Sequence, residues 1–302
     1  MRKEFASTIE YFVRDNGKTN MVFLTGDLGF MALENVRDIL GDRFVNVGVS
    51  EQNMMSMAAA MAHEGLQVIC YSIAPFAVFR PAEQIRLDIC LHKKNVKIVG
   101  NGGGYGYGIM GATHHAIEDI AVLSAFQNMH CYIPFCNEDV ENITRAMLNH
   151  PFPSYLRLGF GILPVGWDLL PFAPIRQLAK GNKITIVGMG PVLCNIAGAI
   201  EENDIADIFA VSEIPLTELS EELKQSIVRT KRLLVVEEHV QRGGLGEHLA
   251  LHLALKNLSC QFTHRFARGY ENGLYGSQKY HQQQCGLDTI SLKQTIETII
   301  NG

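Results

Sequence analysis

Glu51 is the first residue whose type and position suggest chemistry. It follows the short apolar segment 43–50, which predicts a strand, and it begins a helix for which Ser50 is a candidate N-cap. In a doubly wound sheet the carboxyl ends of the strands face the ligand crevice, where a carboxylate can serve in acid–base chemistry. Alternatively, Glu51 only favours the positive end of the helix, which contributes about 0.3–1 kcal/mol. The spacing leaves both interpretations open.

The loop 100–111 is rich in glycine, and His114 and His115 follow it closely. It contains a G-x-G-x-x-G match that begins at Gly106. A dinucleotide site requires this pattern directly after a strand and an acidic residue about 20 positions later. Neither condition is met, so the glycines are better explained by close approach of the backbone to a ligand or a partner chain. The two histidines are suited to acid–base work or to a structural role.

Two phenylalanines and two arginines follow or end predicted strands. Phe76 and Phe79 come after the apolar segment 66–74, where an aromatic pair forms either core or a platform for a flat heterocycle. Arg80 lies just beyond that pair, and Arg157 lies at a strand end. Each arginine is either an ordinary surface residue or a clamp for a phosphate group.

The elements that must position these residues alternate along the chain. Apolar segments predict strands at 21–29, 43–50, 66–74, 95–100, 129–135 and 153–160, with helices at 3–15, 51–63, 81–94, 117–126 and 139–150 between them. This alternation is typical of a doubly wound parallel sheet with helices on both faces. We therefore predict a first α/β domain over 1–163. Residues 164–181 contain prolines and little periodicity, which predicts a linker. A smaller α/β domain over 182–302 follows, with one of its helices at 192–203.

Composition excludes several classes of protein. Of 302 residues, 47% are hydrophobic and 19% are charged, which excludes wholesale disorder and allows a large core. The net charge is −5 without a basic block, so we expect no nucleic-acid or anionic-membrane surface. The longest uncharged apolar stretch, at 54–62, is far shorter than the ~20 residues that span a bilayer. Seven scattered cysteines without a CxxC pair, and a charged N-terminal segment, favour a reduced cytoplasmic protein with no metal ligands of its own.

Six segments, taken in order, resemble the C-terminal half of the transketolase family of thiamine-diphosphate enzymes. The resemblance covers essentially the whole chain. It is carried by LTGDLG (24–29), VGVSEQNMMSMAAAMAHEG (47–65), FAVFRPAEQIR (76–86), GATHHAIEDIAVLSAFQNM (111–129), YLRLG (155–159) and LLVVEEHVQRGGLGEHLA (233–250). It implies a pyrimidine-binding domain followed by a transketolase C-terminal domain.

The resemblance also implies roles for individual residues. Residues that contact the cofactor, thiamine diphosphate, are expected to be Asp27, Leu28, Glu51, Phe76, Phe79 and Arg80. Glu51 is the expected catalytic carboxyl, which shares a proton with the cofactor's pyrimidine ring. His114 is the second expected catalytic residue and contacts the sugar substrate, while Arg157 is expected to hold the substrate's phosphate. The implied reaction transfers a two-carbon ketol unit between sugars, which are expected to be phosphorylated.

Two departures from the family pattern affect these expectations. Transketolases usually carry an acid before the G-P-T-H segment, where this chain has Met110. The aromatic segment aligns only with a small shift, which makes Phe76 the better candidate and Phe79 the weaker one. Both departures bear on the choice of sugar.

The G-D-G motif, through which the family binds the diphosphate and Mg²⁺, does not occur in this sequence. We therefore expect a separate N-terminal-section subunit to supply the Mg²⁺ ligands. The small residues of segment 58–62 favour close helix packing, so we expect a homodimer of this chain within a heterotetramer. Calorimetry on the isolated chain should accordingly show only weak cofactor binding.

Other functions remain as alternatives. Deoxyxylulose-phosphate synthases and the β subunits of 2-oxo-acid dehydrogenases share this half of the family. The His114 segment favours a sugar substrate over the dehydrogenases, and the absent G-D-G motif disfavours the synthase, which is normally a single chain. A non-catalytic binding module is less favoured because Glu51 is present, and a dinucleotide-dependent oxidoreductase is disfavoured by the loop spacing.

Overall fold

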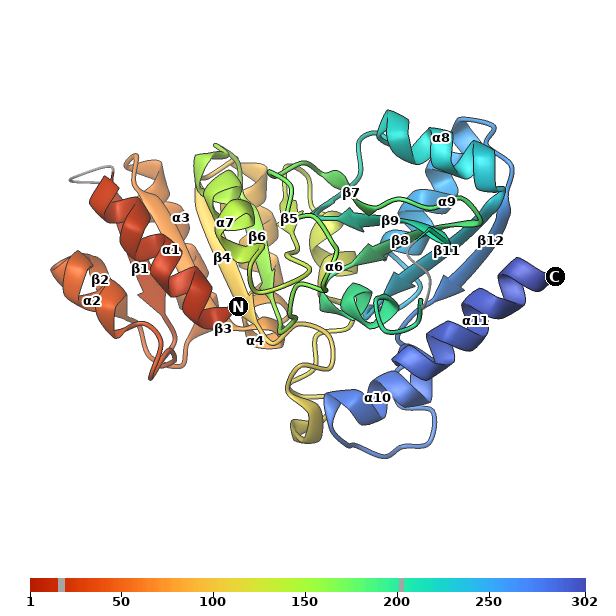
Figure 1. The fold of residues 1–302 in the computed structure, drawn as a ribbon. Helices are drawn as coiled ribbons and strands as arrows, with labels where there is room; N and C mark the ends of the chain where they lie inside the picture. Colours follow the sequence, from red (N-terminus) through yellow and green to blue (C-terminus); the bar gives the residue numbers. More distant parts are fainter. Residues whose placement is uncertain (16–19, 201–203) are drawn as a thin grey trace.

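The computed structural model describes residues 1–15, 20–200 and 204–302, and two β-sheets lie side by side along the chain (Figure 1). Within the described residues, the first sheet has seven strands in the order β10-β5-β6-β4-β3-β1-β2, where β10 is the short segment Glu213–Ile214. The parallel strands are β1 (Met21–Thr25), β2 (Phe44–Asn46), β3 (Gln67–Ile73), β4 (Val96–Asn101), β5 (His130–Tyr132) and β6 (Ser154–Leu158). The predicted parallel sheet is confirmed.

Alternate residues of each central strand face opposite helix layers. Phe23 packs in one cluster with Phe5 of α1, whereas its neighbour Leu24 packs in another with Met54 of α3. The first layer consists of α1 (Arg2–Asp15), α2 (Glu34–Leu40), a 3₁₀ turn (Gly41–Arg43) and α7 (Val140–Asn149). The second consists of α3 (Glu51–His63), α4 (Ala74–Val78), α5 (Ala82–Gln84), the π-helix η2 (Ile85–Leu91) and α6 (Asp119–Ser124). Near-continuous apolar strands are required because both faces are covered.

Within the described residues, the second sheet has five strands in the order β12-β11-β8-β9-β7. They are β7 (Ile175–Ala179), β8 (Ile184–Met189), β9 (Ala206–Val211), β11 (Arg232–Glu237) and β12 (Gln261–Arg265). Helices α8 (Glu221–Thr230) and α9 (Leu245–Leu255) cover the face that joins the core of the first sheet. The 3₁₀ helix η4 (Pro191–Ile196), α10 (Gln278–Cys285) and α11 (Thr289–Asn301) cover the other.

The structure differs from the predicted domain boundaries in two places. Strand β7 lies inside 164–181 and pairs antiparallel with β9, so that segment is not wholly a linker. Its apolar residues, Ile175 and Leu178, are buried, but the strand is too short to give a clear periodic signal. Strand β10 (Glu213–Ile214), from the second domain, pairs antiparallel with β5 and forms an edge of the first sheet.

Local predictions also need correction. The predicted helix 192–203 is a 3₁₀ helix that ends at Ile196, and residues 201–203 lie outside the described residues. Gly198, a poor helix former, lies in the middle of that segment. Ser50 precedes α3, but its hydroxyl donates to the carbonyl of Val47 at 3.0 Å, so it is not a side-chain cap. Among the described residues, we find no helix with both the length and the apolar character needed to cross a membrane.

Candidate functional site

The loops after β1, β2, β3 and β4 bring most of the predicted residues to one edge of the first sheet. These strands are parallel, so their carboxyl ends meet there. Asp27 follows β1, Glu51 begins α3 after β2, and Phe76 lies in α4, which starts directly after β3. Pro75 at the first turn of α4 suits this abrupt change from strand to helix. The glycine-rich loop that leads to His114 follows β4.

Glu51, Phe76 and Arg80 form the centre of the candidate site. The Glu51 side chain is only 4% exposed, and Nη1 of Arg80 lies 3.0 Å from each of its carboxylate oxygens. The guanidinium carbon of Arg80 lies 3.8 Å from the centre of the Phe76 ring, in a cation–π contact. A buried carboxylate and an aromatic face therefore share one planar, positively charged partner.

His114 extends this arrangement through a second contact with Phe76. Its ring centre lies 5.1 Å from that of Phe76, edge to face, and 5.9 Å from that of Tyr107. The hydroxyl of Thr113 lies 2.9 Å from Nδ1 of His114. The hydroxyl of Tyr107 accepts a hydrogen bond from the amide of Asn101 at 2.9 Å. Tyr107 and Asn101 were not predicted from the sequence, where they appear only as members of a glycine-rich loop.

The structure separates the two neighbouring histidines. His115 is 2% exposed, with Nδ1 2.7 Å from the hydroxyl of Tyr270 and Nε2 2.7 Å from the carbonyl of Gly108. Burial lowers the pKa of His115, which favours the neutral ring. Both ring nitrogens of His115 thus have partners within the chain, which leaves His114 as the histidine of the pair with access to a substrate.

Phe79 and Met110 lie at the periphery. Phe79 follows α4 and is 37% exposed. Phe76, rather than Phe79, makes the aromatic contacts with Arg80 and His114. Met110, at the place where an acid was expected, is 54% exposed within the 3₁₀ turn η3 (Gly108–Met110). This turn packs against the start of α10, below the two sheets in Figure 1.

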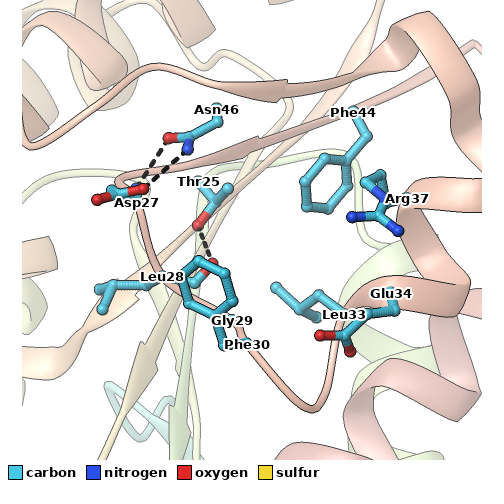
Figure 2. A pocket seen from close by; sticks show the side chains of 10 residues that line it. All are labelled: Thr25, Asp27, Leu28, Gly29, Phe30, Leu33, Glu34, Arg37, Phe44 and Asn46. Atoms are coloured by element: carbon cyan, nitrogen blue, oxygen red, sulfur yellow. Dashed lines mark hydrogen bonds between the residues drawn. The ribbon is translucent and has the colours of Figure 1, made fainter.

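Asp27 and Leu28 line a cavity of about 240 Å³ beside the turn after β1 (Figure 2). Asp27 has a left-handed backbone, with φ of 58°, and its amide donates to Oδ1 of Asn46 at 2.9 Å. Nδ2 of Asn46 returns a hydrogen bond to Oδ1 of Asp27 at 3.0 Å. Asn46, which was not predicted, therefore fixes the conformation of this turn. The remaining lining residues are Thr25, Gly29, Phe30, Leu33, Glu34, Arg37 and Phe44.

Arg157 is not brought together with the other predicted residues. It is 4% exposed, its Nε donates to Asp119 Oδ2 at 2.9 Å, and its Nη2 donates to the carbonyls of Ala116 and Glu238. Burial opposes its charge, but the Asp119 carboxylate, together with Tyr155 and Glu238, outweighs burial, and the pKa of Arg157 is raised. The predicted phosphate-binding role disagrees with this position, because the guanidinium points into the interior between the two sheets.

Glu238 holds the glycine-rich loop against the second domain. Its Oε1 accepts from the amide of Tyr105 at 2.7 Å and from Nε2 of Gln278 at 2.9 Å, and its Oε2 accepts from Gln282. Burial raises the pKa of Glu238. Gly104 is required here, because it has φ of +66° and a Cβ on it would lie 2.3 Å from Oε1 of Glu238. The second domain thus positions the loop that carries His114.

Within the part of the chain that the structure describes, we find no cluster of three or more His, Cys, Asp or Glu side chains arranged to hold a metal ion.

Comparison with known proteins connects this geometry to a family. The pyrimidine-binding domain of transketolase matches residues 14–164, and the transketolase C-terminal domain matches residues 174–268. A protein from Phocaeicola vulgatus, named as one of the subunits of an apulose-4-phosphate transketolase, is 31% identical over 253 residues, which cover 81% of this chain and 80% of that protein. A 1-deoxy-D-xylulose-5-phosphate synthase from Clostridium perfringens is 29% identical over 71% of this chain but only 36% of its own length.

A solved structure agrees with the sequence comparisons. It is described as a split-gene transketolase in an inactive β4 tetramer, and it matches with a TM-score of 0.83 and 25% identity over 99% of this chain and 97% of that one. The order of segments, the fold and these relatives lead to one conclusion. The chain belongs to the transketolase family, and its two sheets correspond to the pyrimidine-binding and C-terminal domains.

Proposed function

We propose that this chain is the C-terminal subunit of a two-subunit, thiamine-diphosphate-dependent transketolase that transfers a two-carbon ketol unit between sugar phosphates. The observation that carries the proposal is the buried Glu51 carboxylate, which Arg80 links to the face of the Phe76 ring. The Phocaeicola vulgatus relative is named as one subunit of a transketolase for a sugar phosphate, which supports both the substrate class and the division into subunits.

The residues of the site fit the aminopyrimidine of thiamine diphosphate. Arg80 already places a planar donor group over Phe76 and against Glu51, so the site accommodates a flat group that stacks and donates hydrogen bonds. An aminopyrimidine has both properties. When bound, the cofactor supplies the carbon nucleophile that the protein itself lacks.

Each residue of the chain then has a defined task. Glu51 holds a shared proton at a ring nitrogen of the pyrimidine, a role for which its burial beside apolar residues of α3 is suited. Phe76 orients the ring by stacking, with Asp27 and Leu28 beside it and Phe79 at the margin. His114 hydrogen-bonds the substrate oxygens and moves a proton there. We assign no phosphate-binding role to Arg157, because its donors are directed into the interior.

A separate N-terminal-section subunit provides the ligands for the diphosphate and Mg²⁺ in this proposal. The Phocaeicola vulgatus transketolase subunit and the neighbour described as a split-gene transketolase both support such a division. We propose two copies of this chain and two of the partner, assembled in the cytoplasm. Ala58 and Ala59 of α3 are buried within the chain's own core, so the predicted helix contact between copies has to use the more exposed Ala60 and Ala62 instead.

Substitution of Glu51 by Gln in the reconstituted complex tests the proposal. Gln keeps the shape of the side chain but cannot share the proton, so hydrogen–deuterium exchange at the thiazolium C2 should slow by orders of magnitude. Each tenfold loss corresponds to about 1.4 kcal/mol of transition-state stabilisation. Rapid quench with NMR measures this exchange, and cofactor affinity should change little because the diphosphate ligands lie on the partner.

His114→Ala is the matched control. It should leave C2 exchange unchanged and reduce turnover of the sugar, because His114 acts on the substrate rather than on the pyrimidine. If Glu51→Gln exchanges at a nearly normal rate, Glu51 merely supports the start of α3 and the proposed role is lost. The synthase alternative, supported by the Clostridium perfringens relative, predicts a 1-deoxy product, which mass spectrometry distinguishes from a ketose that retains its C1 hydroxyl.

A further inference from the structure

Arg80 imitates a bound aminopyrimidine in three respects. Its guanidinium is planar, it lies over the Phe76 ring at 3.8 Å, and it donates to both oxygens of Glu51 at 3.0 Å. Stacking on an aromatic ring and hydrogen bonding to a carboxylate are the two interactions that the proposed function requires of the pyrimidine. Arg80 and a ligand cannot occupy this position and make these two interactions at the same time.

We infer that Arg80 is an internal placeholder, whose guanidinium fills the pyrimidine position in the cofactor-free protein and must leave it before the cofactor binds. This inference rests on the proposed function for the identity of the ligand. It changes the role of Arg80 from a cofactor contact to a competitor of the cofactor. Arg80 thereby sets the affinity of the site without forming part of it in the loaded state.

Burial of Glu51 explains why a placeholder is needed. The carboxylate is 4% exposed, and a buried carboxylate without a partner is strongly unfavourable. An incoming aminopyrimidine supplies donors to replace the guanidinium, so Glu51 has a partner both before and after binding.

The exposure of Arg80 explains why it can be displaced. Its side chain is 45% exposed, and it reaches Glu51 through a single terminal nitrogen, Nη1. Half-exposed ion pairs and cation–π contacts are each weak, so the guanidinium can move into solvent at modest cost. Arg80 lies two residues beyond the end of α4, where the chain turns before α5, so its movement does not require a helix to unfold.

Chemical complementation of Arg80→Ala tests the placeholder directly in the full chain. Methylguanidinium at millimolar concentration should fill the vacated position and raise the unfolding temperature of Arg80→Ala. It should have no such effect on the wild type or on Arg80→Ala/Glu51→Ala, and methylammonium, which cannot stack as a plane, should be less effective. Arg86→Ala is the matched control, because Arg86 is an exposed arginine on the neighbouring π-helix. Absence of a selective effect of methylguanidinium would overturn the inference.

Affinity for the pyrimidine fragment provides the second measurement. The probe is 4-amino-5-hydroxymethyl-2-methylpyrimidine, titrated by NMR into the full chain. Removal of the competing contacts should tighten its binding to Arg80→Ala by about 3- to 30-fold relative to the wild type and to Arg86→Ala. Arg80→Lys retains the charge but not the plane, and it should give an intermediate gain. This variant also serves if Arg80→Ala folds poorly.

The outcomes separate the inference from the proposed function. Equal affinity in the wild type and Arg80→Ala would remove the placeholder and leave the proposed function intact. Weaker binding by Arg80→Ala would make Arg80 a ligand of the cofactor and also overturn the inference. If Glu51→Ala binds the fragment as well as Arg80→Ala does, the site is not the pyrimidine site and the proposed function fails. Tighter binding by Arg80→Ala that Glu51→Ala abolishes supports both.

Discussion

Arg80 and Arg157 both pair with a carboxylate beside the first sheet, yet their surroundings differ sharply. The Arg80 side chain is 45% exposed and contacts Glu51 through one nitrogen. Arg157 is 4% exposed, and two of its nitrogens donate to Asp119 and to two carbonyls from different domains. One guanidinium is half exposed and covers the proposed ligand position, whereas the other is fixed inside the junction between the sheets.

The difference shows that burial and the number of hydrogen-bond acceptors decide the role of an arginine. Its position near the end of a strand does not. A buried guanidinium needs a complete set of acceptors, and these acceptors prevent it from binding a ligand. A half-exposed guanidinium with few acceptors is exchangeable. Lys97 extends the comparison, because it is fully buried, has no carboxylate partner among the described residues, and donates to the carbonyls of His150 and Phe152 at 2.6 and 2.8 Å.

Asp119→Asn should have the largest effect on stability. The change preserves shape but leaves the buried charge of Arg157 without its counter-ion, which costs about 3–5 kcal/mol of unfolding free energy. Urea denaturation at neutral pH measures it. Glu118→Gln, one residue earlier with an exposed side chain, removes the same charge and should cost less than about 0.5 kcal/mol.

A double variant sharpens this prediction. Arg157→Met combined with Asp119→Leu removes both charges together, so it should destabilise the protein less than Asp119→Asn alone. A small effect of Asp119→Asn, comparable with that of Glu118→Gln, would show that Arg157 is not held as firmly as its burial indicates. The contrast with Arg80 would then disappear.

Lys97 should give an intermediate, pH-dependent effect. Burial lowers its pKa to about 7 in the folded protein, while the unfolded chain keeps the ordinary value near 10.5. Between these two values the unfolded state binds more protons, so the unfolding free energy rises with pH across this window, falls as pH drops from 10.5 towards 7, and levels off below 7. From pH 7 to pH 9, Lys97 should add about 2 kcal/mol.

Comparison with Lys97→Met isolates this contribution from that of other titrating groups. The difference in unfolding free energy between the wild type and the variant should change by this amount between the two pH values, as measured by urea denaturation. A constant difference would mean that the carbonyl acceptors keep Lys97 charged throughout. Burial of the charged Lys97 ammonium against carbonyl oxygens would then lower the unfolding free energy less than we expect.

Arg80→Ala should have the smallest effect on stability, about 1 kcal/mol, because truncation of a side chain that is 45% exposed opens the Glu51 carboxylate to water rather than leaving it buried without a partner. The effect should shrink further as salt is added, since exposed pairs are screened. Thermal unfolding at low and high salt, with Arg86→Ala for reference, measures both. A loss as large as that of Asp119→Asn would place Arg80 among the fixed structural charges.

Much of the fold could be predicted from the sequence because its signals are local. Apolar segments such as 21–29 and 66–74 contain the central strands, and Glu51 lies at the predicted helix start. The edge strand β10 was missed, since two residues carry no periodic signal and Glu213 pairs with Tyr132, which lies 81 residues earlier in the chain. The η2 segment was predicted as a helix, but its π geometry has no signature in the apolar pattern.

The site could be predicted only in part, because partners distant in sequence decide the roles of its residues. Sequence placed Glu51, Phe76 and His114 near one sheet edge, and the structure brings them together. It did not indicate that Arg80 reaches back 29 residues to Glu51, or that Arg157 points inward. Strand β6 is buried along its whole length, so its sequence does not alternate between apolar and polar residues. The sequence therefore does not indicate toward which face of the sheet Arg157 points.

The small strand β10 has a consequence for how the gene can be divided. A break anywhere between residues 163 and 182 would place β10 on one polypeptide and its pairing partner β5 on the other. The same cut would separate Tyr105 from Glu238, and with it the support of the loop that carries His114. We therefore expect both sheets to be encoded on one polypeptide. Fission, fusion and domain exchange are expected to succeed outside this pair of sheets rather than between them.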